Sequence, residues 1–97
     1  MPMQEFYDKY NLNKYNFASI AGVGTKSLIK YANGETIREA TRLRIEKAMR
    51  IAEKYGLERP RYDYGKALFG GMSYKNEFHR KDREYEDTFK RLIEEES

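Results

Sequence analysis

The spacing of apolar residues along the chain predicts a series of helices, and no segment alternates in the manner of a strand. The clearest early case is Phe17, Ile20 and Ala21, which recur at i, i+3 and i+4. They predict a helix over residues 14–21, and Asn13 stands where a side chain can cap its first amides.

A longer helix is predicted after residue 36. Thr36 and Glu39 form the T-x-x-E pattern of a capping box, which starts the helix at Ile37. The apolar positions that follow recur at i, i+3, i+4 and i+7: Ile45, Ala48, Met49 and Ala52. Gly56 is expected to end this helix.

The remaining segments are less regular. Residues 3–10 allow either a short amphipathic helix or a flexible arm. Residues 57–72 are predicted to be a connector, because Pro60 cannot continue a helix. Within the connector, residues 62–69 could form one or two helical turns before the flexible pair Gly70-Gly71.

The last segment, residues 73–95, is densely charged and carries a short apolar seam. Tyr85, Phe89 and Leu92 follow a 4-3 spacing, which suits packing against a partner helix and predicts a dimer. The expected organisation is a DNA-binding domain over residues 1–56, a basic linker over 57–72 and a dimerising helix over 73–97. The fold class is therefore all-α: a small helix-turn-helix bundle of four to five helices plus a charged C-terminal helix.

Residues 18–34 have the residue types of a helix-turn-helix. Ala18 is small enough for two helices to cross closely, and Gly22 tolerates the positive φ of a tight turn. A second short helix is predicted from Thr25 to about residue 32, and it ends at a left-handed exit formed by Asn33-Gly34. The expected core members are Ala18, Val23, Leu28, Tyr31, Ile45 and Met49. The outward positions are Thr25, Lys26, Ser27 and Lys30, which would face a DNA major groove.

Charge supports a polyanionic partner for the first part of the chain. The formal net charge is +3, but residues 1–71 carry thirteen Lys and Arg against eight Asp and Glu, whereas residues 72–97 carry six against eight. Arg59 and Arg61 make the connector basic, so it could follow a DNA backbone.

Composition argues against several other classes. There is no cysteine, which removes disulfides and thiolate metal sites and favours the cytoplasm. No long apolar run suggests a membrane span, and the N-terminus lacks a secretory pattern. His79 and Asp82 form only a weak candidate pair for a metal ion. The nine tyrosines are too scattered along the chain to form a surface on which bases stack. No nucleophilic side chain is accompanied by a plausible general base. We expect no enzyme activity, metal or cofactor.

The stretch from Asn13 to Pro60 resembles the DNA-binding headpiece of the lactose-repressor family. The matching blocks are AGVG at 21–24, KYANG at 30–34, TRLRIEKAM at 41–49 and LERP at 57–60. The resemblance implies that Thr25, Lys26 and Lys30 contact bases, with Ser27 beside them. It also implies that Tyr15 and Asn33 lie near the phosphates. A lysine can donate to guanine O6 and N7, and a threonine can contact a thymine methyl.

The chain also departs from that family. Gly24 replaces the usual Ser or Thr cap, so the cap is expected to shift to Thr25, and Ile29 stands where a polar residue usually faces DNA. Leu68 is the nearest counterpart of the family's hinge leucine, but it lies in a different sequence. Only 37 residues follow Pro60, so no sugar-sensing domain and no small-molecule effector are implied.

The sequence thus predicts a small dimeric transcriptional regulator that binds double-stranded DNA sequence-specifically. Two alternatives stay open. The chain could be a helical adaptor or inhibitor that binds a protein through its charged C-terminal helix, or an architectural DNA-binding protein, as in plasmid partition.

Overall fold

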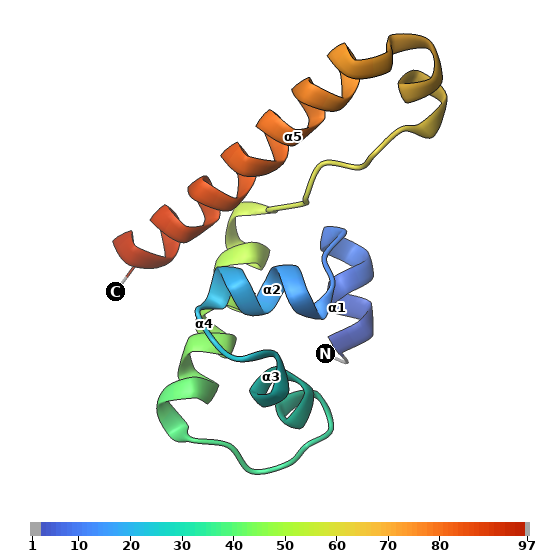
Figure 1. The fold of residues 1–97 in the computed structure, drawn as a ribbon. Helices are drawn as coiled ribbons and strands as arrows, with labels where there is room; N and C mark the ends of the chain where they lie inside the picture. Colours follow the sequence, from blue (N-terminus) through green and yellow to red (C-terminus); the bar gives the residue numbers. More distant parts are fainter. Residues whose placement is uncertain (1–2, 97) are drawn as a thin grey trace.

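The computed structural model describes residues 3–96 and consists of five helices joined by turns and loops, with no strand in that range (Figure 1). The helices are α1 (Met3–Tyr10), α2 (Lys14–Ala21), α3 (Thr25–Ala32), α4 (Glu39–Tyr55) and α5 (Tyr64–Glu95). The all-α prediction is confirmed. Helices α1 to α4 form a compact group, and the first part of α5 projects beyond it while the later part runs diagonally along one side (Figure 1).

The first segment is a helix, so the alternative of a flexible arm is wrong for residues 3–10. Its apolar face, Met3, Phe6 and Tyr10, is buried. The Phe6 ring lies 5.0 Å from the Phe17 ring of α2. Burying these rings removes apolar area from water, which is what keeps a helix of only eight residues in place.

The helix-turn-helix geometry follows from three local features. Asn13 Oδ1 accepts hydrogen bonds from the backbone N–H groups of Tyr15 and Asn16, both at 2.9 Å, so the predicted cap of α2 is confirmed. Gly22 ends α2 with φ 71°, a left-handed conformation that a glycine adopts without strain. Between the helices, Ala18 and Leu28 are buried, as expected for residues at the crossing.

The prediction for the start of α4 is wrong by two residues. The helix begins at Glu39, with Arg38 in the N-cap position and no side chain capping it, so Thr36 does not form a capping box. Ile37 is half-buried against the core and lies in the loop before the helix. We attribute the late start to this packing, which outweighs a local capping preference. The left-handed residue after α3 is Gly34 alone, because Asn33 has φ −87°.

Element α5 consists of two helical segments that meet at a kink, in agreement with the helical turns predicted within residues 62–69 and the helix predicted over residues 73–95. It begins at Tyr64, where Asp63 Oδ1 accepts a hydrogen bond from the Lys66 N–H at 3.1 Å, and it contains a non-helical residue, Gly71, with φ 57° and ψ −137°. The expected joint at Gly70-Gly71 therefore exists as a kink inside α5, while residues 57–63 alone are the connector.

The apolar seam of α5 packs against the chain's own core. Phe89 is fully buried, and Tyr85, Leu92 and Ile93 lie against the same cluster as α2 and α4. Residues 85–93 are thus continuous with the core of residues 3–56, in contrast to the separate dimerising helix expected from the sequence. The seam is not available to a partner helix, and a homodimer stays a prediction without an assigned surface.

The predicted core residues are found inside or at the edge of that cluster. Ala18, Leu28 and Ile45 are buried, and Val23, Tyr31 and Met49 are partly buried against it. None of the helices described combines the length and apolarity needed to cross a bilayer.

Candidate nucleic-acid interface

The outer face of α3 is polar and cationic, while its inner face packs on the core. Leu28 is fully buried, whereas Lys26 and Lys30 are exposed. Neither lysine makes a hydrogen bond or ion pair with another described residue, so both ammonium groups are free to meet an anion. Thr25 and Ser27 are half-buried beside them. The structure therefore brings four of the predicted contact residues together on one helix.

The N-terminus of α3 leaves its first amides open. Gly24 takes the N-cap position with no side-chain hydrogen bond, so the expectation that Thr25 becomes the cap is wrong: Thr25 is the first helical residue. The first helical hydrogen bond runs from the Leu28 N–H to the Gly24 carbonyl at 3.1 Å. The N–H groups before Leu28 thus lie at the positive end of the helix, where a phosphate oxygen would be stabilised.

A recess of about 390 Å³ adjoins this face, between α3 and the start of α4. It is lined by Ser27, Lys30, Thr36, Ile37, Arg38 and Thr41. Arg38 and the two threonines were not predicted as contacts. Since α4 starts only at Glu39, residues 36–38 lie in the preceding loop and form a wall of the recess. Its cations and hydroxyls are donors that suit phosphate oxygens.

Two further predicted residues lie at helix ends. Tyr15 is in the first turn of α2 with 65% of its surface exposed, and the Lys14 ammonium lies 5.4 Å from its ring centroid. Asn33 is exposed at the C-terminus of α3, where its backbone N–H donates to the Ile29 carbonyl at 3.0 Å. Both side chains are accessible to a ligand.

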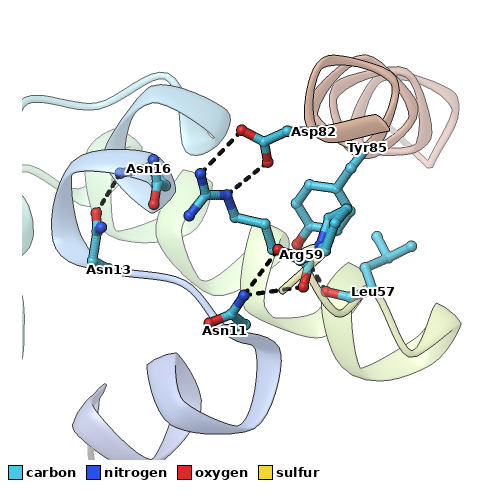
Figure 2. A network of polar contacts seen from close by, with 8 residues as sticks. Asn11, Asn13, Asn16, Leu57, Arg59, Asp82 and Tyr85 are labelled. Carbon is cyan, nitrogen blue, oxygen red and sulfur yellow. Dashed lines mark hydrogen bonds and ion pairs between the residues drawn. The ribbon is translucent and has the colours of Figure 1, made fainter. Parts of the chain in front are cut away.

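Arg59, by contrast, is part of an internal network that joins three segments (Figure 2). Its guanidinium donates from Nε and Nη2 to the Asp82 carboxylate on α5 at 2.7 and 3.0 Å. Its backbone N–H donates to the Tyr10 carbonyl at 2.9 Å, and its own carbonyl accepts from Asn11 Nδ2 at 3.2 Å. The hydrogen bonds to Asp82 raise the pKa of the Arg59 guanidinium above its ordinary value.

Arg61 is also paired, though at the surface. Its Nε donates to Glu58 Oε1 at 2.7 Å, and both side chains are largely exposed. The connector that carries both arginines lies at the end of the molecule away from α3 (Figure 1). The structure therefore separates Arg59 and Arg61 from the predicted DNA contacts on α3, and Arg59 has a structural role.

The basic residues of α4 are partly engaged. Arg42 is paired with Glu46 at 2.9 Å, and Arg44 Nη1 donates to the Gly22 carbonyl at 3.2 Å. The Arg44 contact holds the turn between α2 and α3. Arg44 thereby helps to position α3, and we assign it no ligand contact.

No family model, curated protein or solved structure matches this chain. Across residues 3–96, no cluster of three or more carboxylate and imidazole side chains could hold a metal ion. The resemblance to the lactose-repressor headpiece is thus carried by the sequence blocks quoted above.

Proposed function

We propose that this protein binds double-stranded DNA by placing the outer face of α3 in the major groove. The observation that carries the proposal is the combination on one eight-residue helix of a fully buried Leu28 with unpaired Lys26 and Lys30 on the opposite side. The helix before it, α2, is joined by a glycine turn, as in helix-turn-helix proteins whose second helix contacts base edges.

Phosphate contacts would flank that face. The open amides at the start of α3 lie on one side, and the recess with Arg38 lies on the other. Such contacts fix the orientation of a protein on DNA, while side chains in the groove supply sequence preference. We assign base contacts to Thr25, Lys26 and Lys30, and phosphate contacts to Arg38 and the α3 amides. A role as a transcriptional regulator follows if the bound sites overlap promoters.

The direct test is selection of bound sequences from a random duplex library with the full chain, followed by binding measurements at several salt concentrations. Lys26→Ala and Lys30→Ala should each weaken binding about tenfold or more, and Lys26→Ala should relax the sequence preference. Arg38→Ala should weaken binding to all duplexes alike. It should also reduce the slope of log K against log salt concentration by about one, the value for one released counterion.

Lys75→Ala is the matched control, because Lys75 is an exposed lysine on α5. It should bind like the parent. If the Lys26 and Lys30 variants also bind a selected site like the parent, the assigned face is wrong. Absence of any salt-dependent retention on duplex DNA would instead favour the adaptor hypothesis. A palindromic selected site would support two copies per site, and a single half-site would support a monomer.

A further inference from the structure

A second structural unit, which we call the hook, is formed by residues 60–81. It comprises the end of the connector and the first part of α5, and the chain reverses within it at Gly71, far from α3 in Figure 1. Four aromatic rings pack together here. The Tyr62 ring lies 4.9 Å from Tyr64, 5.6 Å from Tyr74 and 5.0 Å from Phe78. None of them belongs to the main core.

One hydrogen bond fixes the Tyr74 ring of this group. The Asp63 N–H donates to the Tyr74 hydroxyl at 2.9 Å, which joins the connector to α5 across the hook. Beside the rings is an open cavity of about 720 Å³, a volume within the range of small-molecule sites. Tyr62, Tyr64, Tyr74 and Phe78 all line it, and Tyr64 is 77% exposed, so one ring presents a free face.

The same cavity is lined by three cations. Arg61 is bonded to Glu58 at 2.7 Å and Lys81 to Glu77 at 3.3 Å, whereas the Lys66 ammonium has no partner among the described residues. The other acidic residue of the lining is Asp63, whose Oδ1 accepts a hydrogen bond from the backbone N–H of Lys66. Besides the Asp63 carboxylate, the cavity therefore offers an exposed aromatic face and an unpaired ammonium group.

We infer that this cavity binds a nucleotide, with the base stacked on the Tyr64 ring and a phosphate at Lys66. A nucleotide offers a flat π-face and an anion a short distance apart, and the hook offers the matching pair. The ligand can come from two sources: a free nucleotide, or an unpaired nucleotide in a nucleic-acid strand. The inference is independent of duplex binding by α3, because the two sites use different residues at different ends of the molecule.

The test is a titration of the ¹⁵N-labelled full chain with ATP, adenosine and tripolyphosphate, monitored by amide chemical shifts. ATP should shift amides of residues 60–81 and bind at least about fivefold more tightly than either adenosine or tripolyphosphate. Lys66→Glu should weaken ATP binding about tenfold and leave adenosine binding unchanged, since it reverses the charge that meets the phosphate and leaves the stacking ring in place. Tyr64→Ala should weaken binding of both ATP and adenosine, because it removes the stacking face.

Phe69→Ala is the matched control, since Phe69 is an aromatic residue of the hook with 95% exposure that does not line the cavity. It should bind ATP like the parent. Equal affinity for tripolyphosphate and ATP, or ATP shifts that survive both Lys66→Glu and Tyr64→Ala, would overturn the inference. A short oligothymidylate strand separates the sources: tighter binding than ATP at the hook identifies a strand nucleotide, and ATP binding alone identifies a free one. Titration with a DNA duplex tests the proposed function separately: it should shift amides of α3 and leave those of residues 60–81 unchanged. Failure of one proposal can therefore be told apart from failure of the other.

Discussion

Arg59 and Asp82 are joined by a two-point ion pair that connects the loop after α4 to the middle of α5. The guanidinium Nε and Nη2 meet the two carboxylate oxygens at 2.7 and 3.0 Å. Only 25% of the Arg59 side chain and 27% of the Asp82 side chain are exposed. Such paired, charge-assisted hydrogen bonds are stronger than surface ion pairs and restrict orientation.

Breaking this pair should destabilise the fold. Arg59→Ala is expected to lower the free energy of unfolding by about 1–2 kcal/mol in urea titrations, because it leaves a partly buried Asp82 carboxylate without its donor. A double-mutant cycle with Asp82→Ala should give a coupling of about 1 kcal/mol. Arg61→Ala is the matched control, since its pair with Glu58 is exposed and should change stability by less than about 0.5 kcal/mol. Equal effects of the two arginine variants would contradict the structural role of Arg59.

Phe89 should make the C-terminal half of α5 necessary for folding. Its ring is fully buried in the core of the helix-turn-helix bundle. Phe89→Ala is expected to cost about 3–5 kcal/mol, a large part of the stability of so small a domain. Deleting residues 74–97 should therefore abolish cooperative thermal unfolding. The control Phe69→Ala should leave the transition near that of the parent, because that ring is exposed. A truncated chain that still unfolds at the parent's midpoint would show that α5 is dispensable.

Gly71 should be required for the reversal of the chain in the hook. Its φ of 57° and ψ of −137° are strained for any residue with a side chain, although an added Cβ would meet no atom within 4 Å. The cost of Gly71→Ala is then conformational, about 1–3 kcal/mol, and the chain can relieve it by continuing the helix. We expect a straighter α5, a radius of gyration larger than that of the parent by small-angle scattering, and loss of nucleotide binding. Ser73→Ala, at a nearby exposed position, should retain the parent's dimensions.

Tyr85 should make the protein sensitive to alkali. Burial raises the pKa of its hydroxyl well above the ordinary 10.0, and the hydroxyl donates to the Leu57 carbonyl at 2.8 Å. Above pH 10 the unfolded chain therefore loses this proton while the folded chain keeps it, so stability falls as pH rises.

The measurement is urea unfolding between pH 9 and about pH 11.5 for the parent and Tyr85→Phe. Tyr85→Phe should be less stable than the parent at pH 9, because it loses the hydrogen bond to Leu57, but its stability should fall less steeply with pH. A residual slope is expected, because burial also raises the pKa values of Tyr7 and Tyr31. Identical slopes would mean that Tyr85 ionises as readily in the folded state as in the unfolded state.

Local sequence signals were sufficient for much of the bundle. The bounds of α2, its Asn13 cap and its Gly22 terminus all depend on residues within one turn of one another, and each was predicted correctly. The same holds for the glycine joint in α5. The candidate face of α3 could also be predicted, because a buried Leu28 at helical spacing determines which positions point outward.

Tertiary contacts decided what the local patterns left open or stated wrongly. Thr36 and Glu39 form a capping-box pattern, yet Ile37 packs on the core before α4 begins, and this burial outweighs one cap. The apolar seam of Tyr85, Phe89 and Leu92 could pack on a helix of the same chain or of another chain. Its periodicity does not specify which of these helices covers it. Arg59 has the same charge as an arginine that contacts phosphate, and only the approach of Asp82 from 23 positions away gives it an internal partner.

The sequence by itself thus determined helices α2 and α3, the turn between them, and the cationic character of α3, because these depend on side chains that are neighbours along the chain. Only the tertiary structure decided that α5 folds back onto the bundle, that Arg59 is withdrawn from the surface, and that four rings and a free lysine meet in the hook. Those outcomes depend on apolar burial and charge pairing between segments that are distant in sequence, and no local pattern specifies which segments meet.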